Sequence, residues 1–253
     1  MLSRRTFLST TAGAIAGATI LPYAARAAAG GADSFATANG TVTVHPVAHA
    51  SFVMQVPGMV IYNDPVGDPA MYARFPKPDL ILITHEHGDH YNADTLAALV
   101  GPNTKIIANP AVQAKMPEAL AAMSTQIANG GAMMVGDMKL DAVPAYNTTE
   151  ERLKYHPKGR DNGYVLTIDA MRIYIAGDTE DTPEMRALTD IDLAFVPMNL
   201  PYTMDVGAAA SAVNAFKPRA VYPYHYRDSD PMEFARLVEA AGGVMVHQGP
   251  WYG

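Results

Sequence analysis

The densest group of chemically active side chains in the sequence lies in the stretch ITHEHGDHYN, residues 83–92. It places three of the chain's eight histidines and an aspartate within six positions, as His85, His87, Asp89 and His90. Imidazole nitrogens and carboxylate oxygens are common ligands of divalent transition metals. Because the chain contains no cysteine, a metal has to be held by His, Asp or Glu. The stretch therefore predicts a metal centre, with a solvated polar loop as the alternative.

The backbone expected around this motif would aim its side chains at two points. Residues 79–84 form a short, continuous apolar run, as in a strand that is buried on both faces. On the extended chain after it, side chains two positions apart point the same way, so His85 and His87 can share one cation. Gly88 permits a sharp turn, beyond which the next two residues can reach a second cation. The motif thus predicts half-sites for two metals.

The elements that must position this motif alternate between strands and helices, without a repeat of fixed period. Strands are expected at residues 41–44, 51–56, 60–62, 79–84, 104–108, 139–145, 163–168, 172–176, 193–196, 220–224 and 243–247. Helices are expected at 93–100, 207–216, 231–241 and 110–123, the last broken or kinked at Pro117. Two sheets packed face to face with helices outside would bury the apolar faces of all these elements.

The motif HEHGDH resembles the H-x-H-x-D-H signature of the metallo-β-lactamase fold superfamily. This resemblance implies an α/β fold, the four-layer αβ/βα sandwich, with the metals at one edge between the two sheets. It also implies a bridging aspartate after a strand, which Asp178 in AGDT fits, and a late histidine, which His225 in YPYHY fits. A helix-capping role for Asp178 and a core position for His225 are the alternatives.

The family also places a histidine between the opening motif and the bridging aspartate. His156 is the one histidine in that interval. Asn147 in PAYNTTE lies near where some relatives have a histidine ligand, which leaves a substrate contact open as the role of His156. By the resemblance, the first metal is expected on His85, His87, His156 and Asp178, and the second on Asp89, His90 and His225.

Shorter motifs resemble the ascorbate-6-phosphate-lactonase-like metal-dependent hydrolases within this superfamily. They are HAS at residues 49–51, DP at 64–65, PEM at 183–185 and YTMD at 202–205. By this resemblance we expect His49 to face the site and bind substrate, with a structural role as the alternative. Asp64 either orients a metal ligand or is an ordinary turn residue. His45 and His247 are expected to be structural.

Basic side chains alternate along RLKYHPKGR, at Arg152, Lys154, His156, Lys158 and Arg160. If this segment is extended, all five point to one side. Lys158 and Arg160 would then bind substrate by drawing an anion into the cleft. Pro157 and Gly159 also permit a turn that would scatter the pattern, and a solvated loop is the other interpretation.

The N-terminus carries features of an export signal. SRRTFL, residues 3–8, looks like a twin-arginine signal. The apolar run at 8–21 is shorter than the roughly 20 residues that span a bilayer, and ARA at 25–27 fits a cleavage site. We expect a signal peptide at 1–27, with an uncleaved anchor as the alternative, a linker at 28–40 and a single hydrolase domain at 41–253.

These features predict an exported hydrolase, periplasmic or secreted, with two divalent metal ions. Zinc is expected, with manganese or iron as alternatives. A hydroxide between the metals would attack a small ester, lactone or phosphoester, while Asp89 and Asp178 act as catalytic residues that orient it and take up a proton. The expected partners are a small-molecule substrate, with an anion as one candidate, and the export machinery. The net charge of −7 argues against nucleic acid.

Two other functions fit parts of the sequence. An oxygen-reducing di-iron relative has a similar ligand set, but that branch pairs with a flavin-binding domain, which nothing in these residues provides. A metal-binding or partner-binding module with a vestigial site would lack ligands, whereas nearly all of the expected ligands are present.

Overall fold

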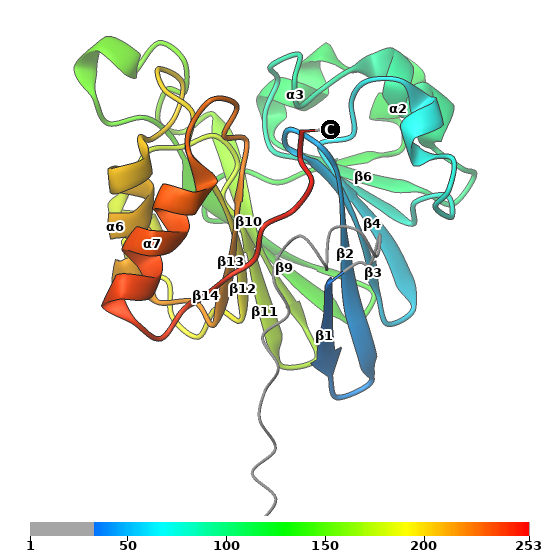
Figure 1. Ribbon diagram of the computed structural model, residues 1–253. Coiled ribbons are helices and arrows are strands. Elements are labelled where there is room, and N and C mark those ends of the chain that lie inside the picture. Colours follow the sequence, from blue (N-terminus) through cyan, green and yellow to red (C-terminus); the bar gives the residue numbers. More distant parts are fainter. Residues whose placement is uncertain (1–32, 253) are drawn as a thin grey trace, which may run out of the picture. The chain divides into compact units, whose positions relative to one another are not determined.

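The computed structural model describes residues 33–252 (Figure 1). Seven strands form a first sheet in chain order: β1 (Asp33–Thr37), β2 (Gly40–Ala48), β3 (Ser51–Val56), β4 (Met59–Asn63), β5 (Leu80–Ile83), β6 (Lys105–Ala108) and β7 (Ser124–Gln126). Seven more form a second sheet, again as neighbours in sequence: β8 (Ala132–Val135), β9 (Met138–Ala145), β10 (Asp161–Ile168), β11 (Met171–Ile175), β12 (Leu193–Pro197), β13 (Ala220–Tyr224) and β14 (Met245–Val246). Each sheet starts with antiparallel pairs and ends with parallel ones.

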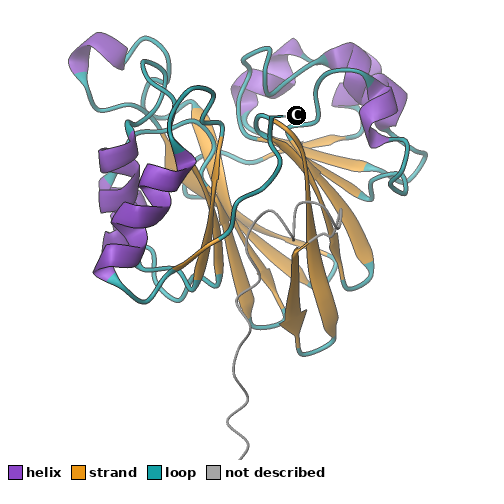
Figure 2. Cartoon of the chain, in the orientation of Figure 1, coloured by secondary structure: helices purple, strands orange, loops and turns teal. Residues whose placement is uncertain are grey.

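The sheets face each other and the helices lie outside them (Figure 2). The first sheet is covered by α2 (Ala93–Leu99), α3 (Pro110–Lys115) and α4 (Glu118–Ala121), and the second by α6 (Val206–Phe216) and α7 (Pro231–Ala241). Three short elements complete the described chain, namely η1 (Pro69–Tyr72), η2 (Glu150–Arg152) and α5 (Pro183–Arg186). The predicted four-layer α/β sandwich is confirmed.

The apolar runs of the central strands explain this layering. In β5, Leu80 and Leu82 point into the core between the sheets. Ile81 and Ile83 point the other way and pack beneath the outer helices. Because successive side chains alternate across a strand, a run that is apolar at every position is buried on both faces. Such a strand fits only an inner layer, so β5 holds the loop that follows it at a fixed place.

The structure agrees with several predicted boundaries and corrects one. β3 has the expected bounds, and α3 and α4 are separated at Pro117, as predicted. The predicted linker is wrong at residues 33–40, because these residues form β1 and the turn into β2. The predicted signal peptide lies outside the described residues. None of the helices between residues 33 and 252 has the length and apolar character that a membrane crossing requires.

The segment after β14 returns across the molecule to the end of β2 (red in Figure 1). There the backbone N–H of His49 donates to the carbonyl of Trp251 at 3.1 Å, and the N–H of His225 donates to the carbonyl of His49 at 3.0 Å. The indole of Trp251 is buried among core aromatics, including Phe52 and Phe195. Loops from both sheets and this returning segment therefore meet at one edge.

Candidate metal centre

The loop after β5 brings the first histidines together as predicted. Nε2 of His85 lies 3.1 Å from Nδ1 of His87. The backbone then turns at Gly88, and the N–H groups of His90 and Tyr91 both donate to the carbonyl of His87. This turn separates the first two histidines from Asp89 and His90, which point toward the second sheet.

Asp178 follows β11. The residue before it, Gly177, lies close to the backbone of Asn162. Gly177 has a φ of +66°, and a Cβ there would lie 2.8 Å from the carbonyl oxygen of Asn162 and 3.2 Å from the Thr84 side chain. Any larger residue would push the loop away from the β5 end. Glycine at this position thus lets the Asp178 carboxylate sit among the histidines.

Of the two positions considered for the remaining ligand, His156 and Asn147, the structure brings His156 to the cluster. Nε2 of His156 lies 3.4 Å from the Asp178 carboxylate. Asn147 is buried, but its side-chain amide donates to the carbonyls of Arg152 and Tyr202 and so ties two loops together. Asn147 therefore stabilises the loop that carries His156 through these two hydrogen bonds.

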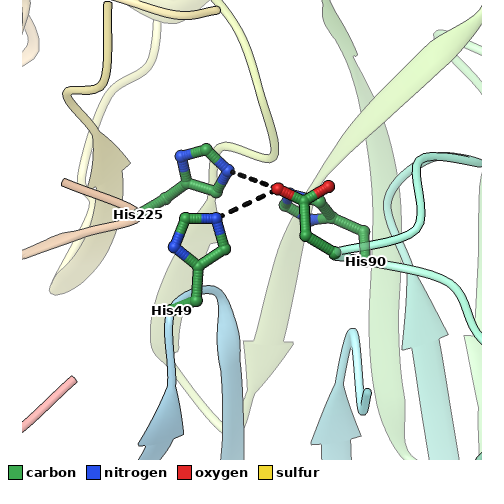
Figure 3. Close-up of side chains that lie close together, drawn as sticks. His49, His90 and His225 are labelled. Carbon is green, nitrogen blue, oxygen red and sulfur yellow. Dashed lines mark hydrogen bonds and ion pairs between the residues drawn. The ribbon is translucent and has the colours of Figure 1, made fainter. Parts of the chain in front are cut away.

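Three groups of ligand atoms result, and in each the atoms lie within 4.8 Å of one another; one of them, His85, His90 and Asp178, connects the other two. The first ligand group is His85, His87 and His156, and the second ligand group is His49, Asp89, His90 and His225. His49, which was expected to bind substrate, thus lies among the ligand atoms of the second group. In Figure 3, His49 and His225 point at the same carboxylate, that of Asp89, at 3.1 and 3.5 Å.

The Asp178 carboxylate lies between the two groups. One of its oxygens, Oδ2, is 3.4 Å from His156 Nε2 and 3.2 Å from His225 Nε2. The other, Oδ1, is 3.3 Å from His90 Nε2. A carboxylate has two oxygens and can contact two cations, whereas a neutral imidazole offers one lone pair. The geometry therefore matches the bridging position expected for Asp178.

Polar partners hold the far sides of these imidazoles. Nδ1 of His90 lies 2.8 Å from Asp64, whose carboxylate also accepts from the N–H and hydroxyl of Thr84. Nδ1 of His156 lies 3.0 Å from Asp161. Such contacts fix ring orientation and leave the other nitrogen free for a metal. Of the two roles considered for Asp64, the geometry therefore supports the orienting one.

The charges of the cluster favour a cation. Burial and the neighbouring histidines lower the pKa of His85 well below its ordinary value, and burial also lowers the pKa of His87. Burial would lower the pKa of His90 too, but the carboxylates of Asp178, Asp64 and Asp89 raise it to about 9. Burial opposes the charge on Asp178, yet His225, His90 and His156 lower its pKa. The carboxylates of Asp64, Asp89 and Asp178 therefore favour the binding of a proton or a metal ion in this cluster.

Unpaired buried atoms test whether the residues fit a metal. Within residues 33–252, His90 Nε2, His156 Nε2, His225 Nε2 and Asp178 Oδ1 are buried and have no hydrogen-bond partner. Buried polar atoms are nearly always bonded, and these four belong to the two ligand groups and the carboxylate between them. The donor set fits divalent cations held by imidazole and carboxylate.

A cavity of about 580 Å³ opens onto the cluster. It is lined by His87, Asp89, His156 and Asp178 of the cluster, and also by Tyr155, Asn199, Leu200, Tyr202, Arg227 and Asp228. A second cleft, of about 810 Å³, lies near the turn at Ala170 and is lined by none of the cluster residues. The chemistry therefore belongs to the smaller cavity.

The basic loop differs from its prediction. Of the alternatives considered for 152–160, an extended segment or turns, the structure has η2 and a series of turns. Lys158 contacts the hydroxyl of Tyr146 and the carboxylate of Glu184 at the surface. Arg160 binds Asp161 through two nitrogens at 2.7 and 2.9 Å. Neither of the two lines the cavity, so the predicted cationic rim has no basis in this geometry.

Sequence reasoning missed several residues at the site, including Asp161, Tyr252, Asn199 and Arg227. Asp161 orients His156, and the Tyr252 hydroxyl lies 2.7 Å from Nδ1 of His49. Asn199 and Arg227 line the cavity. Asp161 lies five positions after His156, which is a usable signal for a ligand and its partner. Tyr252 is 203 positions from His49, and no local pattern joins them.

His45 and His247 stand apart from the ligand groups, as expected for structural residues. The His45 ring packs on Phe75. Nδ1 of His247 lies 3.2 Å from Asp33, and its ring packs against Phe35 and Tyr222.

Comparison with known proteins agrees with this geometry. The family described as Beta-lactamase superfamily domain matches residues 43–225. A protein of Thermococcus onnurineus named UPF0173 metal-dependent hydrolase is 35% identical over 218 residues, covering 81% of this chain and 96% of that protein. Its namesake in Pyrococcus horikoshii is 34% identical over 220 residues, covering 81% and 96%.

Two solved structures add to this. A protein of Parabacteroides distasonis described as a metal-dependent hydrolase has a TM-score of 0.81 and 44% identity, covering 88% of this chain and 99% of that one. A metallo hydrolase from Ignicoccus hospitalis has a TM-score of 0.68 and 26% identity, covering 82% and 94%. The chain therefore belongs to the metallo-β-lactamase fold superfamily and, within it, to the UPF0173 family of metal-dependent hydrolases.

Proposed function

We propose that this metal-dependent hydrolase is binuclear and cleaves a small ester, lactone or phosphoester. The observation that carries the proposal is the position of Asp178, whose carboxylate lies within 3.4 Å of His156 in the first ligand group and within 3.3 Å of His90 and His225 in the second. A site for one ion would not need a buried carboxylate between two sets of imidazoles.

Each ligand group, together with Asp178, would hold one cation. Zinc suits imidazole and carboxylate ligands in the absence of thiolates, with manganese or iron as alternatives. Two divalent cations bound there would acidify a water molecule and polarise the carbonyl or phosphoryl group of the substrate. The protein's part is to hold these groups in place and to move the proton.

The two carboxylates of the centre have different surroundings. The Asp178 side chain is 3% exposed, so it is fixed and enclosed. The Asp89 side chain is 40% exposed and lines the cavity. Burial would raise the pKa of Asp89, but the neighbouring imidazoles of His225, His49 and His90 hold it below its ordinary value. Asp89 is thus anionic and faces the substrate space, where it would orient the attacking water.

Elemental analysis with kinetics tests the proposal. Protein purified without chelator should contain about two equivalents of metal and hydrolyse members of a panel of esters, lactones and phosphodiesters. Asp178→Asn keeps the shape of the side chain but removes its charge, and should lose activity and at least one metal. Asp181→Asn, nearby but paired with Arg186, is the control. Hydrolysis by a protein that consistently contains no metal would overturn the proposal.

We also propose that the protein is exported in the folded state to the periplasm or beyond. The support is the SRRTFL stretch with the apolar run and the ARA site after it. Folding before export would let the cluster take up its metal where metal supply is controlled.

A further inference from the structure

The 580 Å³ cavity has an apolar part as well as a polar one. Cluster residues line it together with Tyr155, Leu200 and Tyr202, which supply apolar surface. The two tyrosine rings meet edge to face, with centroids 5.0 Å apart. Leu200 and Tyr202 are 50% and 43% exposed. Large apolar side chains left open beside a reaction centre mark a place for an apolar part of a ligand.

This apolar wall is held rigidly. The Asn147 amide donates to the carbonyl of Tyr202 at 2.7 Å, and the Arg152 guanidinium donates to the carbonyl of Thr203 at 3.1 Å. The N–H of Asn199 donates to the Thr203 hydroxyl at 2.8 Å. The loop after β12 is thus bonded to the loop that carries Tyr155 and His156. A wall fixed in this way keeps a constant distance from the metal ligands.

Asn199 supplies a polar group to the same cavity. Its residue is only 6% exposed, and it lines the cavity. Its side-chain Nδ2 has no hydrogen-bond partner within residues 33–252. A buried amide donor without a partner costs free energy unless a ligand oxygen accepts from it. The donor is therefore suited to an oxygen of the substrate's hydrolysable group.

We infer that the substrate is an ester or lactone that carries an aromatic-sized apolar group next to the bond that is cleaved. The apolar group packs on Tyr155, Tyr202 and Leu200, and an oxygen of the ester accepts from Asn199. This inference rests on the proposed hydrolytic function and narrows its substrate class. It excludes small, fully polar esters as preferred substrates, because they would leave the wall exposed.

Two lactones with the same reacting ring test this. The metal-loaded protein is assayed with γ-butyrolactone and γ-phenyl-γ-butyrolactone by proton release, each rate being divided by its alkaline hydrolysis rate. Burying a phenyl ring should favour the second lactone in kcat/KM by about tenfold or more. Tyr202→Ala should remove most of that preference, whereas Tyr202→Phe should retain it.

Further variants keep the test decisive. Leu200→Ala repeats the test at an exposed position of the same loop, and Met232→Ala, exposed on α7 away from the cavity, is the matched control. Asn199→Leu removes the amide at similar size and should lower kcat/KM for both lactones. Equal kcat/KM for the two lactones in the wild type, or a preference unchanged by Tyr202→Ala and Leu200→Ala, would overturn the inference.

A binding measurement separates this inference from the proposed function. Calorimetry with the ring-opened products, 4-hydroxybutanoate and 4-hydroxy-4-phenylbutanoate, needs no turnover. If neither lactone is hydrolysed, the proposal that the protein hydrolyses such lactones is refuted. The inferred binding site for an apolar group is still supported if the phenyl compound binds more tightly and loses this advantage in Tyr202→Ala. It is refuted if the two compounds bind equally.

Discussion

The Tyr252 hydroxyl lies 2.7 Å from Nδ1 of His49 and accepts the backbone N–H of Arg227 at 2.9 Å. The other nitrogen of His49 lies 3.1 Å from Asp89. One phenol thus connects the second ligand group to the loop that lines the cavity. Because His49 has a φ of +49° and Arg227 a φ of +40°, both sit in a backbone region that surrounding contacts have to maintain.

Tyr252→Phe should therefore weaken the second ligand group and spare the first. Loss of such an orienting contact to a metal site typically costs about 10- to 100-fold in metal affinity or activity. Metal titration followed by elemental analysis should show one equivalent held as in the wild type and one held more weakly. Tyr91→Phe, which deletes a hydroxyl bonded to the Lys115 carbonyl, is the control. Two equally tight equivalents in Tyr252→Phe would show that the contact is dispensable.

Arg160 should act on the metal rather than on the substrate. Its guanidinium binds both oxygens of Asp161, which in turn holds His156. Arg160→Ala should loosen that carboxylate and lower metal affinity by about tenfold or more, as measured by competition with a chromogenic chelator. Lys158→Ala, at the surface of the same loop, should leave affinity within about twofold. A change in KM for anionic substrates alone, with metal affinity intact, would restore a substrate role for Arg160.

Arg227 should supply whatever preference for anions the site has. Its guanidinium has no hydrogen-bond or ion-pair partner within residues 33–252, and it lines the cavity beside Asp228. Arg227→Ala should raise KM for an anionic ester relative to a neutral analogue, and Asp228→Ala should lower it, because one change removes attraction and the other repulsion. Both effects should shrink with added salt. KM shifts that are equal for the charged and neutral esters would exclude charge selection at this rim.

Glu180 should make the fold sensitive to acid. Burial would raise its pKa, but hydrogen bonds from the N–H and hydroxyl groups of Thr148 and Thr149 hold the pKa below its ordinary value. A depressed folded-state pKa means that this stabilisation is complete above the unfolded pKa, about 4.3, and is lost as the pH falls through the folded value.

The test compares metal-free wild type with Glu180→Gln in urea unfolding. The variant should be less stable by about 1 to 3 kcal/mol at pH 7, since it loses charged hydrogen bonds. The difference between the two proteins should narrow below pH 4. A difference that stays constant down to pH 3 would mean that the charge of Glu180 does not contribute.

The proposed export should depend on the paired arginines at positions 4 and 5. Twin-arginine signals are read by a receptor that distinguishes arginine from lysine. Changing both Arg4 and Arg5 to Lys should keep the full-length protein in the cytoplasmic fraction, while Arg26→Lys should still allow export. Immunoblots of cell fractions check this. Unchanged periplasmic delivery of the double variant would point to another route.

The predictable parts of the structure are those that depend on local pattern. The run at β5 and the spacing of His85 and His87 follow from the alternation of side chains along a strand. Resemblance to the family located Asp178, His156 and His225. The alternation at 152–160 could not decide between an extended segment and turns, and turns form there because Pro157 and Gly159 favour them. β1 was missed because its five residues are alternately part-buried and exposed, without a strong apolar signal.

Other parts depend on tertiary structure. His49, Asp64 and His225 all have left-handed backbone conformations, with φ between +41° and +50°. Such conformations are uncommon for residues other than glycine, and the surrounding fold has to impose them. The bond between Tyr252 and His49 likewise needs the last described residues to return to the end of β2. Neither feature leaves a signal in a short stretch of sequence.

The ligand groups draw on both halves of the chain. His49, His85, His87, Asp89 and His90 follow strands of the first sheet, and His156, Asp178 and His225 belong to the second. The chain has no cysteine, so no disulfide can link the two sheets. Bound cations would thus serve as cross-links between sheets that otherwise adhere by packing and hydrogen bonds. Metal binding to the folded state alone adds to its stability by mass action. Removing the metals with a chelator would therefore loosen the contact between the two sheets at this edge. The resistance of the protein to heat and proteolysis would then increase with the amount of metal bound.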